Sequence, residues 1–149
     1  MTEATGRIVF GSAPPGVVCV KRPASYVVIS RGDGRIAAVR PHRRPYFWLP
    51  GGGAEAGETP AATAIREVRA ELGRVITLTG RIGDAIQYFY ASDDGCWYEM
   101  AATFFRAAFD GSPVSEGEDE LHWVDGREQP EPFFHACHVW AAAQVAQGG

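Results

Sequence analysis

The stretch Trp48–Gly73, WLPGGGAEAGETPAATAIREVRAELG, decides the fold because it joins a glycine-rich loop directly to a helix. The glycines Gly51–Gly53 permit backbone torsions that other residues avoid, and they let a ligand approach the chain closely. Thr59 is a suitable N-cap, and Pro60 suits the first helical position, where a missing N–H costs nothing. Gly73 is a suitable left-handed stop. The stretch therefore predicts a loop followed by a helix over residues 60–72.

Two side-chain faces distinguish this predicted helix. Apolar residues recur at three- and four-residue steps, which predicts a core-facing stripe of Ala61, Ala64, Ile65, Val68 and Leu72. Glu67 and Glu71 are four residues apart and form a second, acidic face. Paired carboxylates on a helix form either a solvated surface or a site for a hard cation such as Mg²⁺. The glycine loop directly before the helix favours the cation site.

The spacing of this stretch resembles the Nudix box, G-x5-E-x7-R-E-U-x-E-E-x-G-U, in which U is an aliphatic residue. Seven of the nine specified positions match, namely Gly52, Glu58, Arg66, Glu67, Val68, Glu71 and Gly73. The two departures are Ala70, which replaces the first Glu of the Glu-Glu pair, and Arg74, which replaces an aliphatic residue. The resemblance implies an α/β fold, a Nudix-type α/β/α sandwich with a mixed central sheet, formed by one domain over residues 1–149.

The resemblance also implies an activity and a set of site residues. Nudix hydrolases of this kind use Mg²⁺, with Mn²⁺ as an alternative, to cleave the pyrophosphate bond of a nucleoside diphosphate linked to another moiety. The implied metal ligands are Glu67, Glu71 and the carbonyl of Gly52. The implied catalytic carboxylates are Glu67 and Glu71, together with Glu118 and Glu120 of an acidic loop, one of which would accept a proton from water.

The departure at Ala70 keeps a second interpretation open. In the family, the Glu at this position helps to hold the catalytic metal ions, and a methyl group cannot replace it. Glu67 and Glu71 would still hold one cation, and a carboxylate from the acidic loop would compensate for Ala70. The alternative function is a catalytically weakened or inactive Nudix-type domain that binds a nucleotide as a sensor. Arg66 is expected to pair with Glu58 and to fix the loop against the helix.

Other candidate side chains have two interpretations each. Arg43 and Arg44 lie in a basic loop before the box, and they are either solvated or bind a substrate phosphate. Tyr88, Trp97 and Tyr98 either pack in the core or stack on a base.

A histidine pair has the same ambiguity. His135 and His138 are three residues apart, so they could bind a metal ion together. No third ligand lies near them in the sequence, which favours a packing or surface role.

Length, charge and cysteine content indicate which partners and which cellular compartment to expect. The chain has 149 residues, a formal net charge of -4 and no cluster of Lys and Arg, so a nucleic-acid polymer is not an expected partner. We expect no membrane interaction, because neither a signal peptide nor an apolar run of membrane-spanning length is visible. Three widely spaced cysteines predict reduced thiols in a cytoplasmic protein. The expected partner is a small nucleotide or nucleoside-diphosphate derivative, and a homodimer is compatible with the family.

The remaining elements follow from turn signals and apolar runs. The predicted strands are 7–10, 17–20, 26–30, 35–40, 75–78, 81–91, 96–109 and 121–124, and a final helix is predicted over 132–147. Two hairpins are expected, one around residues 31–34 and the other around residues 92–95.

Overall fold

The computed structural model describes residues 7–40, 44–125 and 133–148. Its elements in chain order are β1 (Ile8–Phe10), β2 (Val20–Val28), β3 (Ile36–Val39), β4 (Gly51–Gly53), α1 (Pro60–Leu72), β5 (Val75–Ala91), β6 (Cys96–Asp110), β7 (Leu121–Val124) and α2 (Ala136–Gly148).

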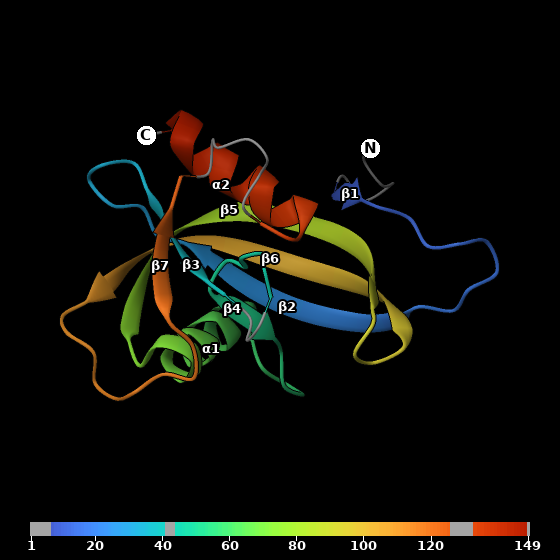
Figure 1. Ribbon diagram of the computed structural model, residues 1–149, viewed down its shortest axis with the longest axis horizontal. Helices are drawn as coiled ribbons and strands as arrows, with labels where there is room; N and C mark the ends of the chain where they lie inside the picture. Colours follow the sequence, from blue (N-terminus) through green and yellow to red (C-terminus); the bar gives the residue numbers. More distant parts are fainter. Residues whose placement is uncertain (1–6, 41–43, 126–132, 149) are drawn as a thin grey trace.

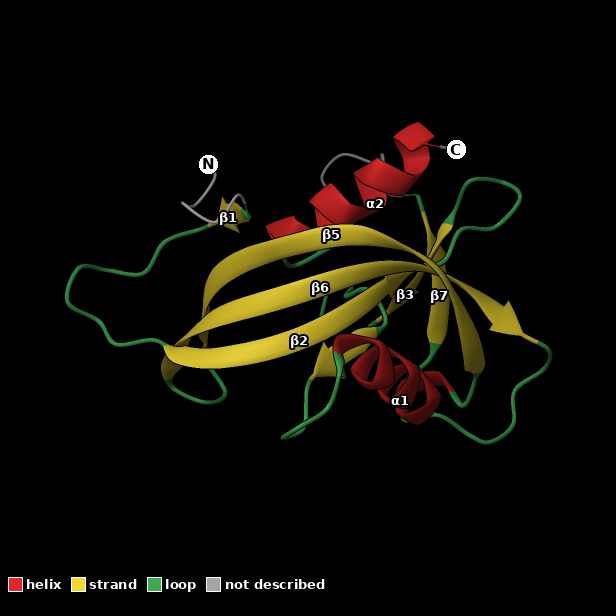
Figure 2. Ribbon diagram, turned by 180° about the vertical axis from the view of Figure 1, so that it is seen from behind, coloured by secondary structure: helices red, strands yellow, loops and turns green. Residues whose placement is uncertain are grey.

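Five strands form a mixed sheet in the order β1-β5-β6-β2-β4, and β3 and β7 form a second, two-stranded sheet. The β5–β6 and β2–β4 pairs are antiparallel, whereas β1–β5 and β2–β6 are parallel. The helices lie on opposite sides of the large sheet, with α2 beside β5 and α1 beneath β2 (Figures 1 and 2). The predicted α/β/α sandwich with a mixed central sheet is confirmed. Neither helix has the length and apolar character that a bilayer-crossing helix requires in the described part of the chain.

Helix α1 begins and ends as its sequence predicts. The Thr59 side chain accepts a hydrogen bond from the backbone N–H of Ala62 at 3.2 Å, and Pro60 opens the helix. Gly73 has φ 64° and donates its N–H to the carbonyl of Arg69 at 2.9 Å. A side chain at Gly73 would also overlap the carbonyl of Ser115. This glycine therefore ends the helix and lets the following acidic loop dock on it.

The buried face of α1 differs from the predicted stripe at one edge. Ala64, Val68 and Leu72 are buried as predicted, but Ile65 is 41% exposed. The buried arc is rotated away from Ile65, so that Glu71 and Thr63 lie inside. Glu71 occupies a position on the buried face where an apolar residue would be expected, because its side chain points into a site and not into the apolar core.

Two strand predictions need correction. The predicted strand at residues 17–20 is wrong, because β2 begins only at Val20 and the Val18 side chain is 91% exposed. The turn at residues 31–34 is confirmed by the bond from Arg31 N–H to the Arg35 carbonyl at 2.8 Å. Its two arms are joined by an antiparallel bridge between Ser30 and Ile36 and by a bond from the Ala37 N–H to the Ile29 carbonyl at 2.9 Å, so the start of the predicted hairpin is present. Beyond it the arms enter different sheets, because β3 pairs with β7. Strands that are buried throughout carry no alternation, so their sequence does not specify their partner.

The segments predicted as strands 75–78 and 81–91 form one continuous strand, β5, with β-bulges between Leu78 and Gly80 and between Arg81 and Gly83. The hairpin of β5 and β6 is confirmed, with Ala91 opposite Cys96 across the turn. The final helix starts later than predicted, at Ala136.

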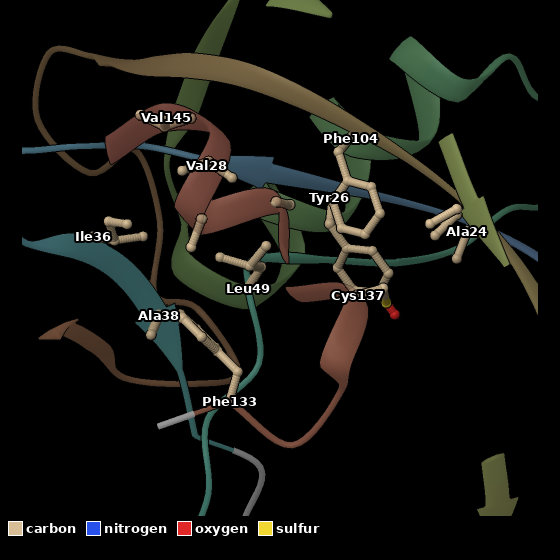
Figure 3. Packing of buried hydrophobic residues seen from close by; sticks show 14 of the residues in the cluster. Ala24, Tyr26, Val28, Ile36, Ala38, Leu49, Phe104, Phe133, Cys137 and Val145 are labelled. Atoms are coloured by element: carbon tan, nitrogen blue, oxygen red, sulfur yellow. The ribbon is translucent and has the colours of Figure 1, made fainter. Parts of the chain in front are cut away.

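The core lies on both faces of the large sheet. One cluster packs beneath α2 and includes Tyr26, Phe104 and Cys137, whose positions Figure 3 shows. The other cluster packs Val27 and Ile76 against α1. Burial of these side chains stabilises the fold by roughly 25 cal/mol for each Å² of apolar area removed from water. The two cores hold β4, α1 and the far end of the β5–β6 hairpin in fixed relative positions.

Candidate functional site

The glycine strand β4 is the edge strand that faces the acidic side of α1. Gly51 has φ 142°, and a side chain there would overlap the carbonyl of Ser25 on β2. Its backbone N–H donates to Oε1 of Glu71 at 2.9 Å. A Cβ on Gly52 would lie 2.9 Å from the carboxylate of Glu67. The absent side chain of Gly51 therefore lets β4 lie close to β2, and that of Gly52 lets the Glu67 carboxylate approach the backbone of β4.

Glu71 is the most perturbed carboxyl group of the site. Glu71 is only 8% exposed to solvent. Its pKa is raised to about 9, chiefly by burial and also by the neighbouring charges of Glu67, Asp119 and Glu118, while the bond from the Gly51 N–H acts in the opposite direction. A strongly shifted carboxyl group in a cleft indicates a functional site, because stability alone disfavours it.

Arg66 ties the loop before α1 to the helix, as predicted. Its guanidinium donates to both Glu58 carboxylate oxygens, at 2.6 and 2.9 Å, and to the carbonyl of Gly53 at 3.0 Å. It also donates to Oε1 of Glu67 at 2.8 Å. The bonds that Glu58 accepts, chiefly from Arg66 and also from the Glu55 N–H and the Thr63 hydroxyl, lower its pKa to about 2. Arg66 therefore positions Glu67 and the glycine strand together.

We expect Arg66→Gln to lower the melting temperature by roughly 3–8 °C, because a network of charge-assisted hydrogen bonds is lost. Differential scanning calorimetry at neutral pH would measure the change. Arg35→Gln is a suitable control, since Arg35 lies on the exposed 31–35 turn beside Asp33. An Arg66→Gln variant as stable as the control would show that this network does not hold the loop.

The acidic loop after β6 docks on the C-terminal turn of α1. The backbone N–H of Glu118 donates to the Ala70 carbonyl at 3.1 Å, and that of Asp119 donates to the Glu71 carbonyl at 2.8 Å. A Cβ on Gly117 would overlap the Glu71 carbonyl, so only glycine permits this close approach. Acidic side chains beside a helix C-terminus are electrostatically unfavourable. The arrangement concentrates negative charge near Glu71 at a cost in stability.

The predicted loop carboxylates differ in their positions. Glu118 lies close enough to influence the charge of Glu71, whereas the Glu120 side chain is 91% exposed and lies 3.9 Å from Nε2 of His122. Both side chains are exposed and neither lines the cavity with Glu67 and Glu71, but the charge of Glu118 acts on Glu71. Asp119 also acts on Glu71 and was not among the predicted residues. No sequence signal separates it from its acidic neighbours, because the selection depends on the docking of the loop.

A cavity of about 750 Å³ opens beside these carboxylates, and it lies within the size range of ligand sites. Its walls include the following aromatic side chains and histidine: Tyr26, Tyr46, Trp48, Phe89, Tyr90, Tyr98, Phe134 and His135. Of the three aromatic residues proposed to stack on a base, Tyr98 lines the cavity, whereas Tyr88 and Trp97 are not among its lining residues. Tyr88 instead donates its hydroxyl to Glu99 at 3.0 Å.

The two predicted phosphate-binding arginines have different outcomes. Arg43 lies outside the described residues. Arg44 lines the cavity and donates to both carboxylate oxygens of Asp93, at 2.7 and 2.6 Å, across to the β5–β6 turn. A phosphate would therefore compete with Asp93 for Arg44, and phosphate binding by Arg44 stays a prediction.

The histidine pair is built into the aromatic wall. His138 is fully buried, and its Nδ1 accepts a hydrogen bond from the Leu49 backbone N–H at 3.1 Å. The His135 ring lies nearly parallel to Trp48, with centroids 6.2 Å apart. Burial lowers the pKa of His135 to about 4 and that of His138 well below its usual value. These contacts favour the packing role over a shared metal ion.

The described residues fit one divalent cation better than a preformed multi-ligand cage. No group of three or more His, Cys, Asp or Glu side chains is arranged to hold a metal ion within the described ranges. Glu67 and Glu71 nevertheless line the same cavity, and the missing Cβ of Gly52 leaves room beside Glu67. Mg²⁺ is commonly held by one or two carboxylates, with water and phosphate oxygens completing its shell. A cation here would also offset the burial and the neighbouring negative charges that raise the pKa of Glu71.

Comparison with known proteins agrees with this geometry. The family model described as NUDIX domain matches residues 20–138. An uncharacterized Nudix hydrolase, YvcI of Bacillus subtilis (strain 168), is 30% identical over 95 residues, which cover 62% of this chain and 60% of that protein. The match thus spans less than two thirds of that relative's length.

Two solved structures share the fold. The chain resembles a MutT NUDIX hydrolase from Burkholderia pseudomallei with a TM-score of 0.61 and 27% identity, over 85% of this chain and 98% of that one. It also resembles a NUDIX hydrolase from Nitrosomonas europaea with a TM-score of 0.68 and 16% identity, over 87% and 90% of the two chains.

Proposed function

This chain belongs to the Nudix family, and from that premise we propose that it is a Mg²⁺-dependent pyrophosphohydrolase. Its substrate would be a nucleoside diphosphate linked to another moiety. One observation carries the proposal: the buried carboxyl group of Glu71 lies at the wall of a nucleotide-sized cavity, with the charge of Glu67 close enough to raise its pKa. Such a group is costly to ionise, and a bound cation is the simplest compensation.

In this proposal, Glu67, Glu71 and the carbonyl of Gly52 would hold the cation. When bound, Mg²⁺ neutralises phosphate charge, polarises phosphorus and lowers the pKa of bound water. The residues of the chain position these groups. Arg66 holds Oε1 of Glu67 at 2.8 Å, which leaves Oε2 beside Gly52.

A carboxylate would accept the proton from the attacking water. Glu67 and Glu118 are the residues whose positions support this role, and a positioned base typically contributes about 10²–10⁴-fold to the rate. Glu118 is held near the site by its backbone bond to Ala70. Glu118 and Glu120 are both exposed, but Glu120 lies beside His122 whereas Glu118 acts on Glu71, which gives the assignment of Glu120 as a base less support.

The experiment that tests the function is a substrate panel with purified protein. Sugar nucleotides, dinucleoside polyphosphates and nucleoside triphosphates, including oxidised ones, would be incubated with Mg²⁺, with Mn²⁺ or with EDTA. We expect the protein to release a nucleoside monophosphate and a second product that contains the other phosphate. This release should occur only in the presence of metal. Equal turnover in EDTA, or no turnover of any compound, would contradict the proposal.

Ala70 favours a second candidate, a nucleotide sensor that does not cleave its ligand. Only two glutamates of α1 remain beside the cavity, and one carboxylate oxygen of Glu67 is already bonded to Arg66. Isothermal titration calorimetry with the same panel separates the candidates. Micromolar binding without product supports the sensor, and binding with metal-dependent product supports the hydrolase.

We expect Ala70→Glu to leave turnover unchanged or to raise it several-fold at limiting Mg²⁺. Ala70 is exposed on α1 beside the docked loop, so a longer side chain has room there. An added carboxylate would increase metal affinity, and roughly tenfold less Mg²⁺ should suffice for half-maximal activity. The measurement is initial rate against Mg²⁺ concentration, with Ala70→Gln as the matched uncharged control. A tenfold fall in turnover with Ala70→Glu alone would contradict a metal site beside residue 70.

A further inference from the structure

Arg22, on β2, is a charged residue of the cavity wall that the predicted site did not include. Among the described residues, no carboxylate lies within ion-pair distance of its guanidinium. Other charged groups of the wall have partners: Arg44 pairs with Asp93, and Glu67 with Arg66. Asp94 accepts the hydroxyl of Tyr98 at 2.6 Å. Arg22 therefore supplies positive charge that no side chain of the described residues neutralises by an ion pair.

Two contacts hold the Arg22 guanidinium in place. It lies 5.5 Å from the centre of the Tyr98 ring, a cation–π distance. A Cβ on Gly53 would also lie 3.4 Å from Nη2. The absence of a side chain at residue 53 therefore lets the guanidinium lie directly against the backbone of β4.

Arg22 and the carboxylates of α1 approach β4 from opposite sides. Successive residues of a strand point to opposite faces, and Gly52 faces Glu67 whereas Gly53 faces Arg22. All of these residues line one cavity, so the cavity extends around the free edge of β4. A ligand crossing this edge would meet the acidic face of α1 at one end and Arg22 at the other. Beyond Arg22 it would reach the stacked rings of Phe89 and Tyr98, whose centroids are 5.4 Å apart.

The positive charge of Arg22 influences His135, another residue of the cavity wall. Burial is the main cause that lowers the pKa of His135, and the charge of Arg22 lowers it further. A guanidinium presents a planar fork of donors that matches two oxygens of one phosphate. Its positive charge also opposes the repulsion that an anionic ligand meets from Glu67 and Glu71.

We infer that Arg22 binds the substrate phosphate nearer the nucleoside, and that the nucleoside lies on the Tyr98 side of β4. This inference rests on the proposed function for the type of substrate. It assigns Arg22 a binding role, because the residue lies across β4 from the carboxylates that would act on water. It also gives the substrate a direction, with the scissile bond toward Glu67 and the nucleoside toward the aromatic wall.

Binding of α,β-methylene-ADP tests the inference independently of turnover, because its carbon bridge between the two phosphates cannot be hydrolysed. Calorimetric titrations would compare wild type, Arg22→Gln, Arg22→Lys and the control Lys21→Gln, each with Mg²⁺ and again in EDTA. Lys21 is adjacent in β2, points to the other face and forms an exposed pair with Glu99, so its replacement removes the same charge away from the cavity. Thermal melts would confirm that each variant is folded.

We expect Arg22→Gln to weaken binding roughly 10- to 100-fold both with Mg²⁺ and in EDTA, because the ligand loses a charged hydrogen-bonding partner. Arg22→Lys should recover part of this loss, and Lys21→Gln should bind within twofold of wild type. Wild-type protein that does not bind the analogue, or folded Arg22→Gln that binds it as tightly as wild type, would overturn the inference. If binding depends on Arg22 but no compound of the panel is cleaved, the inference stands and the hydrolase proposal fails.

Discussion

Glu71→Gln should reduce Mg²⁺-dependent turnover by roughly 10²–10⁴-fold, because a cation at a phosphoryl group is worth several kcal/mol of transition-state stabilisation. Glutamine has nearly the same shape as glutamate, and its side-chain oxygen can still accept the hydrogen bond from the Gly51 N–H. It cannot, however, supply a negative charge to a cation. The change therefore removes the charge of the side chain while keeping its place in the fold.

The stability of this variant separates loss of chemistry from loss of structure. The Glu71 carboxyl group is buried, and its pKa of about 9 shows that ionisation is unfavourable there. Replacement by a neutral group should leave the melting temperature in EDTA at pH 7.5 unchanged or higher. A decrease in activity together with this stability would assign Glu71 to the metal site.

Glu116→Gln is the matched control for the activity measurement, since Glu116 is an exposed residue of the same acidic loop. It should retain turnover within about twofold, in keeping with the small effect of surface substitutions. Rates would be measured with the best substrate of the panel over a range of Mg²⁺ concentrations. Full Mg²⁺-dependent turnover by Glu71→Gln would remove this residue from the mechanism.

The local structure around the box could be predicted because each signal acts over a few residues. Thr59, Pro60 and Gly73 fix the ends of α1 by capping and backbone geometry, which depend little on the rest of the chain. The pair of Arg66 with Glu58 followed from the same short stretch, through the resemblance to a known motif. The predicted mixed sheet also followed from that resemblance.

The rest of the site depends on contacts between distant segments. Arg22 comes 29 positions before Gly51 in the sequence, and only the β2–β4 pairing places it beside the glycines. Asp119 reaches Glu71 because the loop docks on the last turn of α1, which requires Gly117. The pairing of β3 with β7 was missed for a related reason, since a fully buried strand shows no alternation that could identify its neighbour. Local patterns do not contain this information.

In EDTA, the free energy of unfolding should fall as the pH rises from 7 to 8.5, and Glu71→Gln should remove much of this dependence. The folded pKa of Glu71 is about 9, against a usual value of 4.5. Between these values the folded protein retains a proton that the unfolded chain has lost, so the contribution of Glu71 to stability is fully present below pH 4.5 and decreases through the window up to pH 9. The slope from this one group approaches ~1.4 kcal/mol per pH unit.

The choice of pH range isolates Glu71 from the other shifted groups. His135 has a lowered pKa of about 4, so its effect has the opposite sign and is complete once the pH exceeds the usual value of 6.5. The buried thiol of Cys137 has a raised pKa of about 12, so its effect begins only near the usual value of 9. Urea unfolding at pH 7.0, 7.5, 8.0 and 8.5, with wild type and Glu71→Gln compared at each pH, would give the difference in slope.

Mg²⁺ should largely remove this pH dependence in wild-type protein. A cation competes with the proton for Glu71, so its affinity increases as the pH rises, and binding to the folded state stabilises it by RT ln(1 + [Mg²⁺]/Kd). The stabilisation by Mg²⁺ should therefore be larger at pH 8.5 than at pH 7, and it should be small in Glu71→Gln at both values. Equal stabilisation of wild type and variant would place the cation away from Glu71. The raised pKa of one buried carboxyl group thus connects proton loss, metal binding and stability in a single measurable quantity.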